Sequence, residues 1–289
     1  MIVCGLAWAG IGHALAAERL SESPRTTIAD PLPQLVSFPS GDGTLHGFLY
    51  LPAGEGPFPA VIWNHGSEKL PGSRPELARF YTRQGFVFFV PHRQGHGHSP
   101  GQYIGDLQTK ARAAAKDDAE YQRKVIQLHE LYLRDTVAAV NWLRQRLWVD
   151  TNRMVMSGVS YGGIQTLLAA ETDLPIKAYV PFAPGAMSWQ RMPELQERLL
   201  RAVKQAHAPI FLLQATNDYD LGPSEVLGKE LKQKGGLNRA RVYPAYGDSQ
   251  QSGHGAFASQ GTSVWGPDVL AFMDLVLKRK SAPDSPAKK

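Results

Sequence analysis

Short apolar runs alternate with longer amphipathic segments along this sequence, and that alternation limits the possible folds more than any other feature. The apolar runs, which we expect to be strands, cover residues 35–38, 45–51, 60–63, 86–90, 153–157, 177–182, 209–215 and 241–246. Helical spacing or helix-favouring composition marks residues 74–84, 116–147, 161–171, 193–204, 224–234 and 264–279. Strands joined through helices need crossover connections, so the sequence predicts an α/β fold with a mainly parallel sheet of about eight strands and helices on both faces. The turn at 40–43 joins the first two strands directly and predicts an antiparallel edge.

One large domain is expected to account for most of the 289 residues. We place it at residues 35–280, because no repeat interrupts the alternation there. The charged stretch at about 101–134 is expected to be an insert that lies over the active edge of the sheet as a partial helical lid. Residues 18–34 are expected to be a polar linker, and residues 281–289 a flexible tail.

The first 17 residues are apolar and rich in small side chains, which is typical of an export signal peptide. Ala14-Leu15-Ala16 resembles an A-x-A cleavage site, although no lysine or arginine precedes Arg19. The segment is short for a membrane span and His13 interrupts it, and no later segment is a candidate span. We therefore expect a periplasmic or secreted protein, with a cytoplasmic location as the alternative.

Composition argues against several classes of function. Hydrophobic residues make up 43% of the chain and charged residues 20%, as in ordinary globular proteins. The net charge of +5 comes mostly from dispersed lysines and arginines, so we expect no nucleic-acid partner. Cys4 is the single cysteine, which excludes an internal disulfide and argues against a cysteine nucleophile. The sequence does not indicate an oligomeric state.

The segment Gly158-Val159-Ser160-Tyr161-Gly162 carries the strongest chemical signal. It matches G-x-S-x-G and lies between an expected strand and an expected helix, which is the setting of a nucleophile elbow. A sharp turn there exposes the serine hydroxyl in a strained backbone conformation, and the helix N-terminus places free N–H groups beside it. The sequence therefore predicts Ser160 as a nucleophile, and the alternative is a glycine-rich turn without chemistry.

Serine needs a base to act as a nucleophile. In proteins with this elbow the acid and then the histidine follow the serine along the chain. Of the nine histidines only His254 lies after the expected strand at 209–215, so it is the candidate base, in a loop that we expect to be flexible. Asp218 follows that strand and is the candidate acid, with Asp220 as the alternative. Either aspartate could instead cap the helix that begins near Pro223.

A tetrahedral oxyanion needs two hydrogen-bond donors. The N–H of Tyr161 follows the nucleophile and is the first candidate. The loop after the third expected strand supplies the second, from the N–H of Ser67 or Gly66. His65, in the same loop, is expected to be structural, with its ring bonded to nearby backbone.

Together these motifs resemble the α/β-hydrolase superfamily, and within it the dienelactone-hydrolase-like and prolyl-oligopeptidase-like branch. The matching segments are Asn64-His65-Gly66-Ser67, the histidine-rich loop at 93–99, the elbow at 158–163, Asn217-Asp218 and Gly253-His254. The resemblance covers about residues 35–280, and it implies an α/β-hydrolase fold and a serine hydrolase. It is much less specific for the substrate.

Two departures from that branch bear on the activity. Dienelactone hydrolases use a cysteine nucleophile where this chain has Ser160, so we expect ester rather than lactone-specific hydrolysis. Peptidases of the branch usually carry a large additional propeller domain, which we do not find in this sequence, so a peptidase role is disfavoured.

The functional hypothesis is a serine esterase that acts on a small-molecule ester through an acyl-enzyme and needs no cofactor. The alternatives are lactone, thioester or amide hydrolysis by the same residues, or a non-catalytic binding protein of this fold. A further rival is a metal site at His92, His96 and His98. The glycines between these histidines, and the match to the superfamily's loop, favour a structural loop, so we expect no metal.

Overall fold

The expected strands form one eight-stranded sheet, in the order β1-β2-β4-β3-β5-β6-β7-β8. The strands are β1 (Gln34–Ser40), β2 (Gly43–Tyr50), β3 (Phe58–Asn64), β4 (Val87–Pro91), β5 (Val149–Val159), β6 (Ile176–Phe182), β7 (Phe211–Ala215) and β8 (Arg239–Tyr243). β1 pairs with β2, and β2 with β4, in antiparallel fashion, whereas the other neighbours are parallel. The predicted mainly parallel sheet with an antiparallel edge is therefore confirmed.

The computed structural model describes residues 30–278 together with Met1. The expected signal peptide at 1–17 lies outside the described residues apart from Met1, as do most of the linker at 18–34 and the whole tail at 281–289. The described residues from Pro31 to Lys278 belong to one compact unit. Within the described part of the chain, no helix has both the length and the apolar character needed to cross a membrane.

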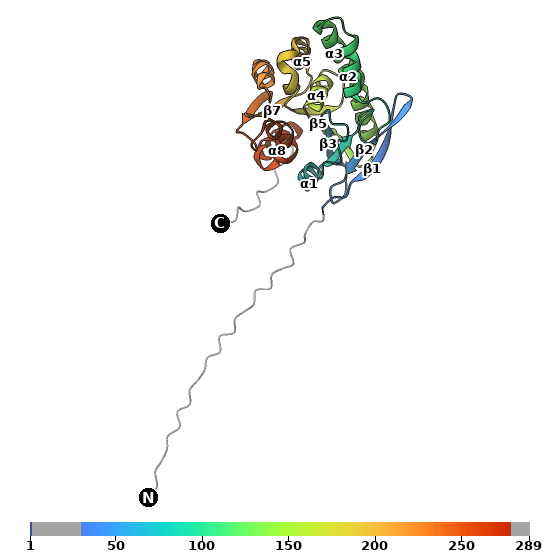
Figure 1. Cartoon of the computed structure of the whole chain (residues 1–289). Coiled ribbons are helices and arrows are strands. Elements are labelled where there is room, and N and C mark those ends of the chain that lie inside the picture. The colour runs from blue at the N-terminus through green and yellow to red at the C-terminus, as the bar shows by residue number, and fades with distance from the viewer. Residues whose placement is uncertain (2–29, 279–289) are drawn as a thin grey trace. The chain divides into compact units, whose positions relative to one another are not determined.

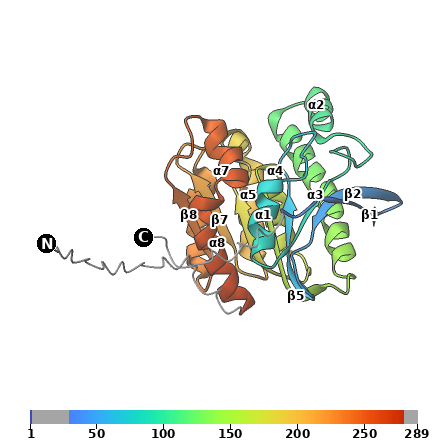
Figure 2. The ribbon, with the colours of Figure 1, turned by 90° about the horizontal axis from the view of Figure 1, so that it is seen from below.

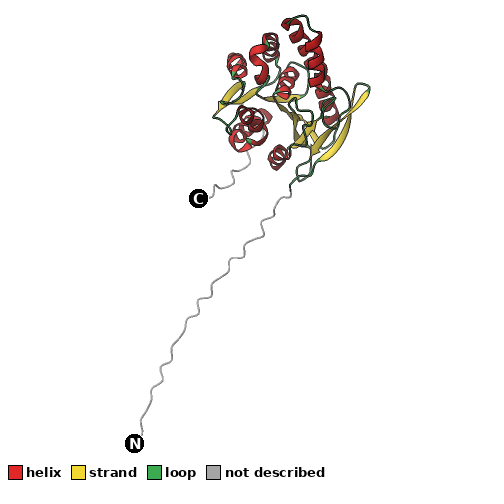
Figure 3. Ribbon diagram, in the orientation of Figure 1, coloured by secondary structure: helices red, strands yellow, loops and turns green. Residues whose placement is uncertain are grey.

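Helices cover both faces of the sheet (Figures 1 and 3). The longer ones are α1 (Pro75–Arg83), α2 (Ile104–Ala114), α3 (Asp118–Leu143), α4 (Tyr161–Ala170), α5 (Pro193–Gln205), α6 (Gly228–Lys234) and α8 (Thr262–Leu277). Shorter helical turns are η1 (Ala186–Arg191), η2 (Pro223–Leu227), η3 (Ser252–Ala256) and α7 (Phe257–Gln260). Figure 2 shows α1, α7 and α8 together on one face, and α3, α4 and α5 lie on the other.

The two-residue period of the strands divides the core between these faces. In β3, Ala60 and Ile62 pack into the cluster that contains α3, α4 and α5. Val61 and Trp63 pack into the opposite cluster, under α1 and α8. All four side chains have no exposed surface, so the strand is buried on both faces, which is why it appears in the sequence as an uninterrupted apolar run.

The segment at 101–134 contains α2 and the first turns of α3, and it is not a separate insert. Its residues line the pockets at the carboxyl edge of the sheet, as expected for a partial lid. However, α3 continues as one helix to Leu143 and packs against β1 and α4, so the same helix also forms the crossover before β5. It begins after Asp117, whose side chain accepts a hydrogen bond of 2.7 Å from the N–H of Glu120. The cap fixes the start of α3 at Asp118, so the helix expected at 116–147 begins there and is separate from α2.

Candidate active site

Ser160 lies at the turn between β5 and α4, with a backbone conformation that a residue with a side chain rarely adopts. Its φ is 57° and its ψ is −115°. Such strain costs about 1–3 kcal/mol and persists only where the surroundings hold it. The N–H of Ser160 donates a 3.0 Å hydrogen bond to the carbonyl of Phe182 in β6. The turn is therefore anchored to the neighbouring strand, and the hydroxyl projects from the carboxyl edge of the sheet.

Three glycines allow this turn to pack so closely. A Cβ on Gly158 would lie 2.7 Å from the carbonyl oxygen of Asn64, and one on Gly162 would collide with the same oxygen. A Cβ on Gly163 would lie 2.7 Å from the carbonyl oxygen of Phe182. The obstacles are backbone atoms that cannot move aside, so the glycines of the motif are required by packing.

Asp218 and His254 form a buried pair at the same edge. Nδ1 of His254 lies 2.7 Å from Oδ1 of Asp218, and the two side chains are 4% and 0% exposed. A carboxylate oxygen accepts hydrogen bonds, so Nδ1 contacts it through its N–H, and Nε2 is the ring nitrogen not bonded to Asp218. Nε2 makes no hydrogen bond to a described residue, Ser160 included. In enzymes without substrate, the hydrogen bond between a catalytic serine and its histidine is often long and tightens only when substrate binds.

The Asp218 carboxylate is held in place by two further donors. Nε2 of Gln214, a residue of β7, donates to Oδ2 at 2.8 Å. The backbone N–H of Tyr219 donates to Oδ1 at 2.7 Å. These bonds fix the orientation of the carboxyl group toward His254.

The two aspartates that the sequence left as alternatives have different partners. Oδ1 of Asp220 accepts the N–H of Gly222 at 2.7 Å, and its carbonyl accepts from Gln214 at 2.9 Å. Asp220 therefore closes the turn before η2 but does not cap that helix, whose N-cap residue is Gly222, whereas Asp218 contacts the imidazole.

His254 lies in the helical turn η3 and not in a flexible loop, so that expectation was wrong. The N–H of Gly253 donates to the carbonyl of Ser249 at 3.0 Å. Asn217, just beyond β7, donates from Nδ2 to the carbonyls of Tyr246 and Ser249 at 3.0 and 2.9 Å. These bonds tie the segment to the strand end, although its glycines and serines suggested mobility.

The loop after β3, which was expected to supply the second oxyanion donor, lies at the same pocket as Ser160. Gly66 and Ser67 line the same pocket as Ser160. Tyr161 is the first residue of α4, so its N–H has no partner within the helix. The Gly66 carbonyl accepts a 2.6 Å hydrogen bond from Nη2 of Arg93. Because the carbonyl and N–H of a trans peptide point in opposite directions, the Ser67 N–H points away from Arg93.

His65 stabilises the same loop. Nδ1 of its ring donates to the Gly66 carbonyl at 2.9 Å, and Nε2 accepts the backbone N–H of Arg93 at 3.4 Å. Burial, followed by the charge of Arg93, lowers the pKa of His65 well below its usual value, so the ring is neutral. This is the structural role that the sequence indicated. The same burial lowers the pKa of Arg93 to about 10, which leaves the guanidinium charged at neutral pH.

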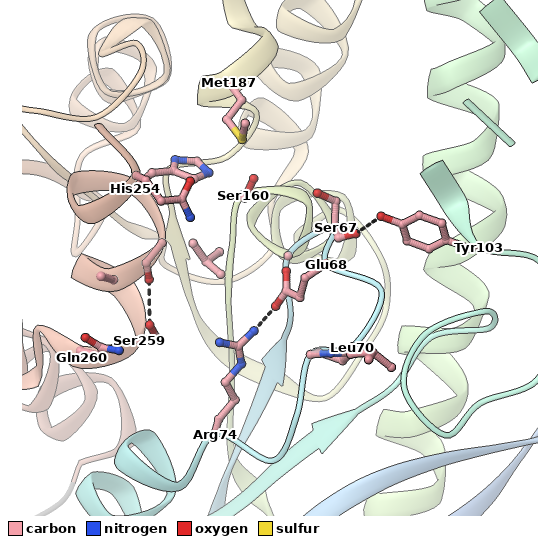
Figure 4. Close-up of a pocket in the computed structure, with 16 residues that line it drawn as sticks. Ser67, Glu68, Leu70, Arg74, Tyr103, Ser160, Met187, His254, Ser259 and Gln260 are labelled. Carbon is pink, nitrogen blue, oxygen red and sulfur yellow. Dashed lines mark hydrogen bonds and ion pairs between the residues drawn. The ribbon is translucent and has the colours of Figure 1, made fainter. Parts of the chain in front are cut away.

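Two pockets meet at Ser160. The first, of about 580 Å³, contains His254 and polar side chains, among them the ion pair of Arg74 with Glu68 (Figure 4). The second, of about 300 Å³, lies between α3, α4, η1 and α5, and both apolar and polar side chains line it. Ser67, Ser160 and Met187 line both pockets. A substrate with its carbonyl at Ser160 can therefore extend in two directions.

The histidine-rich loop does not assemble a metal site. The rings of His92 and His98 stack with their centroids 5.9 Å apart, and that of His96 packs 4.9 Å from His65. His92 Nε2 is also 3.1 Å from the carbonyl of Gly72. Among residues 30–278, no group of three or more histidine, cysteine, aspartate or glutamate side chains is placed to hold a metal ion.

Sequence reasoning missed several residues of the site. Gln214 was visible as the one polar residue in the apolar run of β7, which is a signal that it has a specific partner. The sequence placed Arg93 only within a segment that matches the superfamily, and it gave no signal for His129, which lines the second pocket. Nothing local to either residue indicates what it contacts.

A strained serine between a strand and a helix, and a buried Asp–His pair beyond β7 on a mainly parallel sheet, define a hydrolase of the α/β-hydrolase superfamily. The expected superfamily is thereby confirmed. Within it, the chain belongs to the X-Pro dipeptidyl-peptidase (S15) family, whose model matches residues 42–217. That match includes Ser160 and ends before Asp218 and His254.

Two curated relatives share 28% identity with part of the chain. One is the polyketide transferase grgF of Penicillium sp, over 152 residues that cover 52% of this chain and 44% of that protein. The other is the quorum-quenching protein AidA of Acinetobacter baumannii, over 164 residues that cover 54% of this chain and 46% of that protein. The matches thus span about half the length of these relatives.

Solved structures share the fold at low identity. The acylaminoacyl peptidase of Pyrococcus horikoshii has a TM-score of 0.63 at 18% identity, with 88% of this chain and 43% of that chain covered. A putative dienelactone hydrolase from Klebsiella pneumoniae has a TM-score of 0.58 at 17% identity, with 86% and 99% covered. An esterase of Pyrococcus furiosus has a TM-score of 0.61 at 16% identity, with 86% and 92% covered.

Proposed function

We propose that this chain hydrolyses carboxylic esters of small molecules through an acyl-enzyme formed on Ser160. The observation that carries the proposal is the 2.7 Å contact of Asp218 with Nδ1 of His254. The other ring nitrogen of His254, Nε2, has no hydrogen-bond partner among the described residues, and His254 lines the same pocket as Ser160. A serine hydroxyl needs such a base, since it is a weak nucleophile at its own pKa.

In the proposed reaction, the hydroxyl oxygen of Ser160 attacks the ester carbonyl carbon while its proton passes to Nε2 of His254. The carbonyl oxygen becomes an oxyanion, which the N–H groups of Ser67 and Tyr161 stabilise. The bond to the leaving alkoxide then breaks, and Nε2 returns its proton to that oxygen. Water attacks the acyl-enzyme in the same way, giving a proton to Nε2, and the serine takes that proton back as the acid leaves.

Peptide hydrolysis is the second candidate. It is supported by the S15 family and by the fold shared with an acylaminoacyl peptidase. The fold shared with an esterase, and the 28% identity with a polyketide transferase over part of the chain, support ester or acyl-transfer chemistry as the first candidate. The residues proposed here serve either reaction, because both pass through a tetrahedral intermediate on serine.

A fluorophosphonate probe and a substrate panel test the proposal. We expect the probe to label the protein and Ser160→Ala to abolish both labelling and hydrolysis of p-nitrophenyl esters. Ser157→Ala is a matched control, because that buried serine in β5 donates to the Val180 carbonyl, away from the pocket. A panel of X-Pro p-nitroanilides run beside the esters separates esterase from peptidase. Labelling that persists in Ser160→Ala would remove this residue from the mechanism.

A further inference from the structure

The peptide groups on either side of Ser67 are both anchored through their carbonyls. The Gly66 carbonyl accepts Nη2 of Arg93 at 2.6 Å. The Ser67 carbonyl accepts the hydroxyl of Tyr103 at 2.7 Å (Figure 4). In the proposed function, on which this inference rests, the N–H that lies between these two carbonyls along the chain is an oxyanion donor. The Tyr103 bond therefore holds the peptide group that follows the donor, as the Arg93 bond holds the one that contains it.

The loop needs such anchors because much of it lies at the surface. Ser67 and Lys69 are exposed, and Glu68 is half-buried. Two further contacts hold the segment: Glu68 forms an ion pair with Arg74, and the Lys69 carbonyl accepts the N–H of Gly97 at 2.8 Å. Both contacts lie further along the chain than the Ser67 carbonyl. They hold the donor less directly than Tyr103 does, because each intervening residue adds two rotatable dihedral angles.

Tyr103 is itself held in place. It is the N-cap residue of α2, and its ring packs edge-on against that of His96, with the centroids 5.2 Å apart. The carbonyl of the preceding residue, Gln102, accepts a 2.5 Å hydrogen bond from the hydroxyl of Tyr132 on α3. A Cβ on Gly95 would collide with the same carbonyl, so the chain before Tyr103 packs closely on the histidine-rich loop. The tyrosine hydroxyl therefore projects from a segment that α3 and this loop both fix.

We propose that Tyr103 is a positioning residue for the oxyanion site, because its hydroxyl fixes the Ser67 carbonyl and with it the direction of the Ser67 N–H. The bond also joins the start of α2 to the loop after β3. Its contribution is to the transition state, since the oxyanion exists only after the carbonyl carbon has been attacked. Loss of the bond therefore lowers kcat and leaves KM nearly unchanged.

A direct contact with the leaving group is the alternative role for Tyr103, because this residue lines the pocket that contains His254. The two steps of the reaction separate the two roles. An oxyanion forms in both acylation and deacylation, whereas the alcohol has left before deacylation begins. A positioning residue must therefore affect both steps, and a leaving-group contact must affect acylation alone.

Stopped-flow hydrolysis of p-nitrophenyl acetate resolves acylation, from the initial burst, and deacylation, from the steady state. Tyr103→Phe keeps the ring against His96 and removes only the hydroxyl. Both rate constants should fall about fivefold, as expected for the loss of one neutral hydrogen bond. KM should change by less than about twofold, because it depends on the ratio of the two steps. The affinity for an aryl boronic acid, which forms a tetrahedral adduct on a nucleophilic serine, should fall by the same factor as the rates.

Tyr179→Phe is the matched control. The Tyr179 hydroxyl also donates to a backbone carbonyl, that of Ala169 at 3.2 Å, but it does so in the core, and the residue lines neither pocket at Ser160. This variant should keep both rate constants. Wild-type rates in Tyr103→Phe, or a slowing of acylation alone, would overturn the inference while leaving the esterase in place. Absence of fluorophosphonate labelling and of all ester hydrolysis in wild type would overturn the proposed function and the inference with it.

Discussion

Arg93 offers a sharp test of how the oxyanion site is built. Its side chain is 1% exposed, and Nε and Nη1 make no hydrogen bond to a described residue. Nη2 donates to the Gly66 carbonyl at 2.6 Å. A positive charge on that carbonyl polarises the peptide and strengthens the adjacent Ser67 N–H as a donor. We therefore expect Arg93→Met to slow the chemical step without weakening the fold.

The size of the effect follows from the contacts of the Gly66 carbonyl. A hydrogen bond to a charged group contributes about 1.5–3 kcal/mol, and loss of a whole oxyanion donor costs about 3 kcal/mol. His65 also donates to this carbonyl, so part of the anchoring survives in the variant. We expect a loss of about 2 kcal/mol, or roughly 30-fold in kcat, with KM changed by less than about twofold. Replacing a poorly paired buried cation by an apolar side chain is often neutral or stabilising, so Tm should not fall.

Steady-state hydrolysis of p-nitrophenyl butyrate measures kcat and KM. Affinity for an aryl boronic acid, which forms a tetrahedral adduct on a nucleophilic serine, reports oxyanion stabilisation directly and should fall in parallel with kcat. Arg93→Lys, which retains the charge, should give an intermediate value. The reasoning is refuted if Arg93→Met leaves kcat and boronate affinity near those of wild type, or if activity is lost only in proportion to a fall in Tm.

Three further predictions concern the acid, the turn and the buried histidines. Asp218→Asn should lower kcat roughly 10⁴-fold, because an amide does not enforce the imidazole tautomer. Asp220→Asn should lower kcat by less than about tenfold. Equal losses of kcat in ester assays of the two variants would contradict the assignment of Asp218 as the acid. Gly162→Ala should prevent stable folding, because its Cβ would meet the Asn64 carbonyl, and a normal thermal unfolding curve would argue against this packing. The free energy of unfolding should decrease as pH falls from about 6.5 toward about 4. Burial lowers the pKa of His92 to about 4 in the folded chain, so in this range the unfolded chain binds a proton at His92 and the folded chain does not. Urea unfolding across that range measures the slope, and His92→Phe should flatten it. Burial lowers the pKa of His65, His92, His96 and His129.

The fold could be predicted because its signals are local and periodic. A run such as that of β3 is apolar at every position, since alternate side chains enter different core clusters. The boundaries were less accurate. β8 ends at Tyr243, before the expected limit of 246, because Pro244 has no N–H for the ladder. β5 begins at Val149, earlier than expected, where it pairs with Phe58 of β3.

For the site, the sequence alone was sufficient to predict a sharp strand-to-helix turn at Ser160. The five adjacent residues of G-x-S-x-G include the glycines that such a closely packed turn needs. It also indicated one histidine and two possible acids by chain order. The tertiary structure showed that Asp218 and not Asp220 contacts His254, brought Arg93 to the Gly66 carbonyl, and placed His129 beside the second pocket at Ser160. The physical reason is that a turn is determined by neighbours along the chain, whereas a hydrogen-bond partner or a pocket wall is determined by residues that meet only after the helices have packed on the sheet.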